Sequence, residues 1–77
     1  MRQMVDVKSQ TVLTLTVNGE AKQMPPGSVL DLLAAFGIMP TKVAVERNRE
    51  IVPKSAYGTT LMADGDQFEI VQFVGGG

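Results

Sequence analysis

The chain has 77 residues, of which 44% are hydrophobic and 19% charged, and its formal net charge is -1. This length predicts one small domain, for which one helix packed on one sheet is an efficient architecture. The sequence contains no Cys and no His, which excludes disulfides, zinc sites and thiol or imidazole catalysis. The near-neutral charge argues against a nucleic-acid partner, because binding phosphates takes a surplus of clustered Lys and Arg.

Residues 1–10, "MRQMVDVKSQ", mix charged and polar side chains with scattered Val and Met. We expect them to form a loosely held extension before a domain that spans residues 11–74. They lack the apolar segment and the small-residue cleavage site of a secretory signal. The apolar stretches elsewhere fall far short of a membrane span, so we expect no membrane association and a cytoplasmic location.

The stretch "LTLTV" alternates apolar residues with Thr, which is typical of a half-buried strand. Asn18-Gly19 then favours the two positive φ angles of a type I′ turn, and a returning strand is predicted over residues 20–24. Pro25-Pro26 ends that strand, because proline has no N–H to donate to a neighbouring strand.

The next segment, "GSVLDLLAAFG", predicts a helix. Ser28 is the expected N-cap, and Asp31 is placed to accept backbone N–H groups in the first turn. Gly37 suits the left-handed position just past the helix, and Pro40 prevents its continuation. The residues expected to face the sheet recur at helical spacing and are Val29, Leu32, Leu33 and Phe36.

The second half of the chain predicts three further strands. "VAVE" and "IV" flank a turn at "RNR", and "QFEIVQFV" follows an irregular connection that closes in an Asp64-Gly65 turn. Asp64 and Asp66 are too sparse for a calcium loop, so we expect a turn there. The order of elements predicts an α+β domain of the β-grasp (ubiquitin-like) type: a mixed sheet of four to five strands, one main helix, and the last strand central beside the first.

The last strand carries apolar residues on both of its faces. Phe68 and Ile70 are expected to point into the core, whereas Val71 and Phe73 have the opposite parity. The solvent face of such a sheet is normally polar, so apolar residues there predict a docking patch. A β-bulge that returns Val71 or Phe73 to the core is an equally good explanation.

The sequence ends in three glycines, and we consider the α-carboxylate of Gly77 to be the candidate reactive group. Glycine passes through a narrow channel without steric cost, and Val74–Gly77 can extend about 13 Å. The tail therefore fits a carboxylate that is delivered to a partner's active site. The alternative is a frayed end or a cloning remnant. No catalytic constellation or metal-ligand set is present, so we expect a protein that binds no cofactor or metal and is not an enzyme by itself.

The motifs "VERN" followed by "IVP", then "DGDQFEIVQFVGGG", resemble the ThiS family of sulfur carriers in thiamin biosynthesis, from about Leu13 onward. The resemblance implies that an E1-like adenylating enzyme uses ATP to form an acyl-adenylate on Gly77. Sulfur from a cysteine desulfurase would then give a thiocarboxylate, and thiazole synthase would take up that sulfur. Gly75 and Gly76 would be the flexible arm, with Val71, Phe73 and Val74 as the docking surface.

Three alternatives remain at this level. The chain could carry sulfur for molybdopterin synthesis or tRNA thiolation, or it could be a ubiquitin-like modifier that forms an isopeptide bond through Gly77. It could also be a binding module whose glycines are incidental. The extension of about ten residues at the N-terminus departs from the family pattern and has no assigned role.

Overall fold

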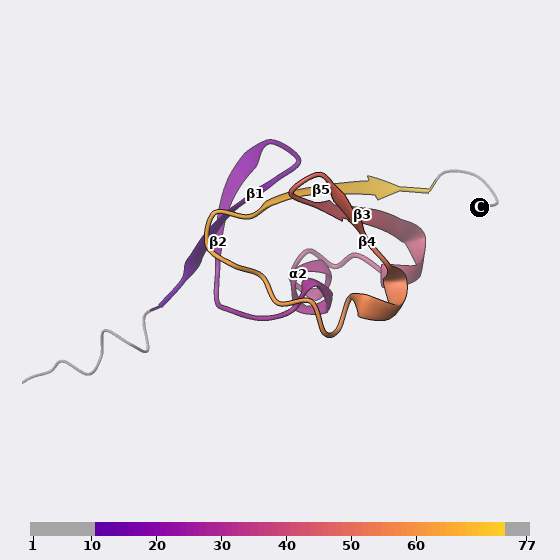
Figure 1. The fold of residues 1–77 in the computed structure, drawn as a ribbon, viewed down its shortest axis with the longest axis horizontal. Helices are drawn as coiled ribbons and strands as arrows, with labels where there is room; N and C mark the ends of the chain where they lie inside the picture. The colour runs from indigo at the N-terminus through magenta and orange to yellow at the C-terminus, as the bar shows by residue number, and fades with distance from the viewer. Residues whose placement is uncertain (1–10, 74–77) are drawn as a thin grey trace, which may run out of the picture.

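The computed structural model of the chain describes residues 11–73. In this part of the chain a five-stranded mixed sheet is covered on one face by one α-helix (Figure 1), which confirms the predicted β-grasp architecture. The predicted extension at residues 1–10, the last residue of the predicted domain, Val74, and the predicted glycine tail at residues 75–77 lie outside the described residues. The elements, in chain order, are β1 (Leu13–Val17), β2 (Glu20–Met24), α2 (Val29–Ala35), the 3-10 helix η1 (Pro40–Lys42), β3 (Val43–Arg47), β4 (Glu50–Val52), the 3-10 helix η2 (Lys54–Ala56) and β5 (Gln67–Gln72).

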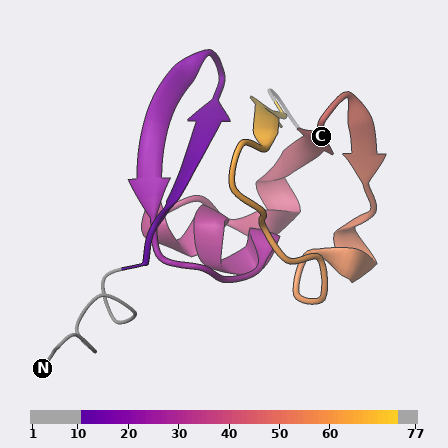
Figure 2. The same ribbon diagram turned by 60° about the vertical axis from the view of Figure 1, so that its left-hand side comes forward.

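The strand order is β2-β1-β5-β3-β4, so the last strand is the central one, as predicted. β5 runs parallel to β1, with Thr16 opposite Gln67 and Val17 opposite Phe68. The other three pairings are antiparallel. The chain crosses from β2 to β3 through α2, which places the helix beneath the sheet in Figures 1 and 2.

Both hairpins turn on residues in the left-handed region. Asn18 has φ 50° and Gly19 has φ 85°, as expected for the predicted type I′ turn between β1 and β2. The turn between β3 and β4 uses Asn48, with φ 52°, and Arg49, with φ 72°. Asn adopts this region more readily than most residues, which explains its position in both turns.

The helix α2 is capped at both ends, as the sequence predicts. The Ser28 side chain accepts the backbone N–H of Asp31 at 3.2 Å, and the Asp31 carboxylate accepts the backbone N–H of Ser28 at 2.9 Å, which forms a capping box. At the other end Gly37 has φ 69°, and the Ile38 N–H donates to the Leu33 carbonyl at 2.9 Å. This is a Schellman motif, which satisfies carbonyls that the helix itself leaves unpaired.

The core lies between α2 and the sheet and includes part of the long connection before β5. That connection, predicted to be irregular, is hydrogen-bonded to the start of the helix and to the residue before its N-cap: the Leu30 N–H donates to the Tyr57 carbonyl at 2.9 Å, and the Met62 N–H donates to the Gly27 carbonyl at 2.8 Å. No helix within residues 11–73 is long and apolar enough to cross a membrane. The buried hydrophobic residues are Leu15, Val17, Met24, Val29, Leu32, Leu33, Val43, Val45, Val52, Tyr57, Met62, Phe68 and Ile70.

The prediction that Phe36 is buried against the sheet is wrong. Val29, Leu32 and Leu33 are fully buried, but the Phe36 side chain is 40% exposed. Phe36 is the C-cap, so it lies past the last helical residue, where the chain is already turning away toward Gly37. The apolar stripe therefore ends one turn earlier on the core side than its spacing indicates.

Candidate functional site at the end of β5

The end of β5 presents apolar side chains to solvent. Val71 is 60% exposed and Phe73 is 47% exposed, whereas Phe68 and Ile70 are buried. The pairing with β3 continues without interruption from Arg47 opposite Phe68 to Val43 opposite Gln72. There is thus no bulge that returns Val71 or Phe73 to the core, and of the two explanations that the sequence left open the structure supports the exposed patch.

Neighbouring strands extend this apolar area on the face of the sheet that α2 does not cover. Ala44 lies directly opposite Val71 in the pairing of β3 with β5. Ile51, which is 72% exposed, lies opposite Glu46, two residues along β3 from Ala44 and therefore on the same face. We call Ala44, Ile51, Val71 and Phe73 the outer apolar patch.

Lys54 fixes the position of Phe73 at the root of the tail. Its ammonium group lies 4.8 Å from the centre of the Phe73 ring, within the range of a cation–π interaction. The same ammonium donates to the carbonyl of Val43, which also accepts the Tyr57 hydroxyl at 3.2 Å. This carbonyl lies beyond the end of β4, since the β3–β4 ladder stops at Val52, which lies opposite Val45. Sequence reasoning missed Lys54, because its partners Val43 and Phe73 lie in β3 and just past β5, far from it in the sequence.

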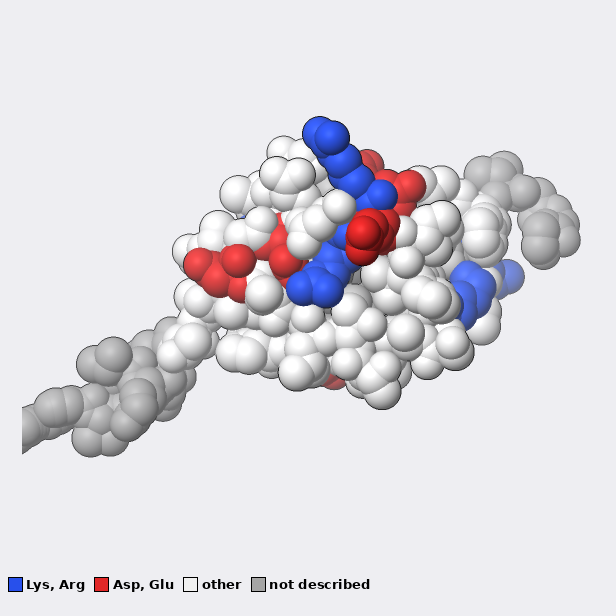
Figure 3. Space-filling model, viewed as in Figure 1, with Lys and Arg blue, Asp and Glu red and all other residues white. Residues whose placement is uncertain are grey.

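The charged side chains are distributed around this site. Figure 3 shows acidic and basic groups interleaved over the middle of the visible face, and further basic groups toward the end of the molecule where β5 ends. Within residues 11–73 no group of three or more Asp, Glu, His or Cys is placed to hold a metal ion.

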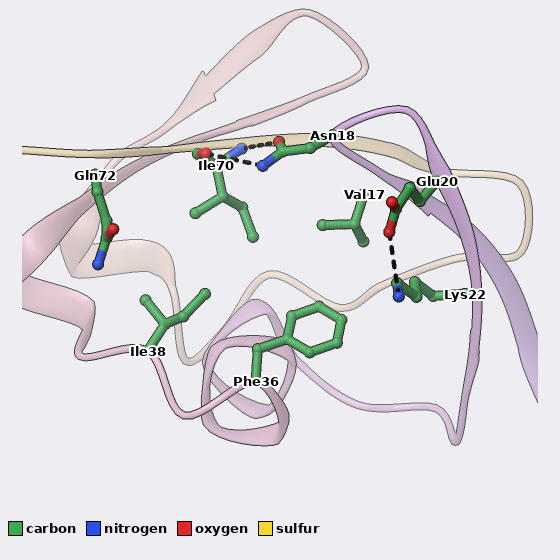
Figure 4. Close-up of a pocket in the computed structure, with 8 residues that line it drawn as sticks. All are labelled: Val17, Asn18, Glu20, Lys22, Phe36, Ile38, Ile70 and Gln72. Carbon is green, nitrogen blue, oxygen red and sulfur yellow. Dashed lines mark hydrogen bonds and ion pairs between the residues drawn. The ribbon is translucent and has the colours of Figure 1, made fainter.

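A cleft of about 500 Å³ opens on the other side of β5, between the sheet and the C-terminal end of α2. Figure 4 shows the side chains of Ile70 and Gln72 on one side of it, with Phe36 and Ile38 facing them. Val17 and the residues of the first hairpin close one end, where Lys22 forms an ion pair with Glu20 at 3.4 Å. The residues that line the cleft are Val17, Asn18, Glu20, Lys22, Phe36, Ile38, Ile70 and Gln72.

Asp66, predicted only as part of a turn, is a buried carboxylate at the start of β5 and is 5% exposed. Its oxygens accept hydrogen bonds from the Arg47 guanidinium at 2.8 Å, the Asn48 amide at 3.0 Å and the backbone N–H of Ala63 at 2.8 Å. Burial raises the pKa of Asp66, but the hydrogen bonds and the Arg47 charge outweigh burial and leave this pKa below its usual value. Asp66 therefore joins the β3–β4 turn to the base of the last strand.

These features define a class of protein: a β-grasp domain whose central, last strand leads from an exposed apolar patch toward the C-terminal end of the chain. The ThiS family model matches residues 15–77, and the chain belongs to the ThiS family. The predicted functional residues Val74, Gly75, Gly76 and Gly77 fall within that match but outside the described residues.

Known proteins with similar sequences include carriers and enzymes. The sulfur carrier protein ThiS of Bacillus subtilis is 47% identical over 51 residues, which is 66% of this chain and 77% of that protein. A thiazole synthase of Paramagnetospirillum magneticum is 47% identical over 66 residues, which is 84% of this chain but 20% of the enzyme. A thiazole synthase of Magnetococcus marinus is 41% identical over the same length. The chain thus spans about a fifth of each of these two enzymes.

Among solved structures, the crystal structure of the thiamine biosynthesis protein ThiS from Geobacter metallireducens superposes with a TM-score of 0.73 at 35% sequence identity. The superposition covers 84% of this chain and 100% of that one. A solution structure of the thiamine biosynthesis protein from the same organism gives a TM-score of 0.71 at the same identity.

Proposed function

We propose that the chain is a sulfur carrier in thiamin biosynthesis and that sulfur is carried on the α-carboxylate of Gly77. The observation that carries the proposal is the family match, which runs from Leu15 through the terminal glycines. The exposed patch beside the root of the tail supports it, because a carrier without a catalytic constellation of its own must dock on the enzymes that modify it.

The proposed chemistry begins on an E1-like adenylating enzyme. A carboxylate oxygen of Gly77 attacks the α-phosphorus of ATP, which releases pyrophosphate and leaves an acyl-adenylate, a far better acyl electrophile than the carboxylate. The terminal sulfur of a persulfide, charged by a cysteine desulfurase, attacks the acyl carbon and AMP leaves. A thiol then reduces the resulting acyl disulfide to the thiocarboxylate and is itself oxidised to a disulfide.

Thiazole synthase is the proposed acceptor of this sulfur. The names of the two relatives from Paramagnetospirillum magneticum and Magnetococcus marinus support this assignment, since segments of those enzymes are similar to most of this chain. The carrier itself contributes a docking surface and a substrate group, and ATP is bound by the adenylating partner. Such a protein is a co-substrate of enzymes, and we place it in the cytoplasm with them.

The test is the intact mass of the protein after incubation with the adenylating enzyme, ATP, a cysteine desulfurase and cysteine. We expect a gain equal to the replacement of one oxygen by sulfur, localised to Gly77 by fragmentation. A variant that lacks Gly77 should show no gain. If the enzymes are active on a known carrier and the wild-type mass stays unchanged, the proposal is wrong, and an adduct on a lysine of another protein would indicate a modifier instead.

The docking surface has a test of its own. Val71→Asp and Phe73→Asp should weaken binding to the adenylating enzyme while the thermal transition of the domain persists, because both side chains are exposed. Leu61→Asp is the matched control, since Leu61 is 67% exposed but lies beside the first residues of α2, away from β5. Equal losses of affinity in all three variants would contradict a localised docking surface.

A further inference from the structure

The edge of β5 that faces β1 is only partly paired, because β1 is the shorter strand. The ladder between them contains two residue pairs, and β1 then ends in the turn at Asn18. Beyond this ladder, the backbone N–H and the side-chain amide of Asn18 form hydrogen bonds with β5. Its backbone N–H donates to the Phe68 carbonyl at 2.9 Å, and its side chain accepts the Ile70 N–H at 2.7 Å and donates to the Ile70 carbonyl at 3.1 Å.

Gln72 is the next residue of β5 whose backbone groups point to this edge. Backbone groups alternate between the two edges of a strand, and Phe73 donates to the Lys42 carbonyl on the β3 side at 2.9 Å. The N–H and C=O of Gln72 therefore face the β1 side, beyond the reach of Asn18. Gln72 is exposed, and because the β1–β5 ladder ends at Val17 and Phe68, no residue of β1 lies opposite it.

The unpaired edge lies directly beside the cleft of Figure 4. The Gln72 and Ile70 side chains line the β5 side of that cleft, and Phe36 and Ile38 line the side formed by the end of α2. Phe36 leaves 40% of its surface uncovered here, although its helix places three other apolar residues entirely in the core. The cleft has an apolar part formed by Val17, Phe36, Ile38 and Ile70, and its other lining residues are polar or charged. An apolar pocket next to free backbone donors and acceptors is the arrangement by which sheets accept an extended peptide: the backbone gives affinity and alternate side chains enter pockets.

We propose that an extended segment of the adenylating enzyme adds to β5 as a strand at Gln72 and inserts one bulky apolar side chain into the cleft between Phe36 and Ile38. An added strand directs alternate side chains to the helix side of the sheet, where the cleft opens. The position continues the docking surface at the root of the tail, because Gln72 lies between Val71 and Phe73. This inference rests on the proposed carrier function, and it makes both faces of β5 part of one interface.

The direct test is amide hydrogen exchange at Gln72 by NMR, with and without the adenylating enzyme. In the free protein the Gln72 amide should exchange rapidly while the neighbouring Phe73 amide, bonded to Lys42, is protected. In the complex the Gln72 amide should become protected. If it still exchanges rapidly in a complex that is shown to be saturated, the added strand does not form and the inference is overturned.

Two variants separate the backbone contact from the cleft. Gln72→Pro removes the free N–H but no bond to β3, and proline is tolerated in strands where its N–H would face outward. Phe36→Ala removes one wall of the cleft. Each should raise the dissociation constant about tenfold, the effect of one lost hydrogen bond or one lost apolar contact at an interface. Leu61→Ala, at the other end of α2, is the control and should bind as the wild type does.

The outcomes distinguish this inference from the function on which it rests. If the wild type gains no sulfur with active enzymes, the carrier function itself fails. If the wild type is converted and both variants bind with unchanged affinity, the carrier function stands and the added strand is refuted. Should Gln72→Pro fail to fold, the exchange measurement and Phe36→Ala still decide the question.

Discussion

Asp66→Asn removes one negative charge from a buried site without changing its volume. In the wild type one carboxylate oxygen accepts from both Arg47 and Ala63, and the other accepts from the Asn48 amide. An asparagine can place its oxygen at only one of these positions, so its NH2 group must face a donor at the other. Asn48 cannot turn over to compensate, because its own oxygen accepts the backbone N–H of Gln67 at 2.9 Å.

The expected loss in the free energy of unfolding at pH 7 is about 2 kcal/mol, from one broken hydrogen bond, one buried donor left unpaired and the lost ionic character of the bond to Arg47. The total free energy of unfolding of a domain of this size is roughly 4–12 kcal/mol. The melting temperature should fall by roughly 10 °C. The measurement is urea and thermal unfolding followed by circular dichroism, with Asp64→Asn as the control, since exposed Asp64 accepts one N–H, from Thr14, and the amide oxygen can replace it.

The same variant gives a pH dependence of defined sign. The pKa of Asp66 is lowered in the folded protein, so its ionised form contributes stability above the pKa of the unfolded chain, near 3.9, and that contribution is lost as the pH falls through the lower folded value. The difference in the free energy of unfolding between wild type and Asp66→Asn should therefore become smaller from pH 7 toward pH 2. A gap below about 0.5 kcal/mol at pH 7, or one that widens in acid, would refute the reasoning.

Three further predictions concern local structure, and each is measured by urea unfolding. Ser28→Ala removes the N-cap of α2 and should lower the free energy of unfolding by about 1 kcal/mol. A decrease no larger than that caused by substituting an exposed surface residue would contradict the capping role. Asn18→Gly keeps the positive φ of the turn but leaves both backbone groups of Ile70 without their protein partner. It should lower the free energy of unfolding by about 1–3 kcal/mol. An unchanged urea midpoint would show that water fully replaces the Asn18 amide. In Gly65→Ala the added Cβ meets no neighbouring atom, but alanine must adopt φ 87°. This backbone strain should lower the free energy of unfolding by about 1 kcal/mol. A variant more stable than the wild type would contradict this prediction.

The sequence was sufficient where local chemistry decides the structure. Asn18-Gly19 predicts its turn because both residues accept positive φ, and Ser28 predicts the start of α2 because the cap involves residues only three apart. The patch at Val71 and Phe73 followed from strand parity, but only the uninterrupted pairing with β3 could exclude a bulge. In each of these cases the partners are close in sequence, or the period of a strand fixes the face.

The sequence was insufficient where the partner is distant. Phe36 fits a helical stripe, yet the Schellman motif ends the helix before its side chain can turn inward. Asp66 reads as a turn residue, because nothing local shows that Arg47 and Asn48 arrive beside it from another hairpin. The free edge at Gln72 depends on where β1 stops relative to β5, which is a property of register between strands some 50 residues apart.

The central position of β5 determines the order in which this domain can be completed. β1 and β3 do not pair with each other, so the two halves of the sheet have no common partner until residues 67–72 have been synthesised and inserted. The first hairpin and α2 can form early, but joining them to β3 and β4 requires a contact across about 50 residues, and such non-local pairing is slow. A nascent chain that ends short of β5 would therefore be an open pair of hairpins with an uncovered core. The segment that leads to the terminus proposed to carry sulfur is thus also the one that closes the fold.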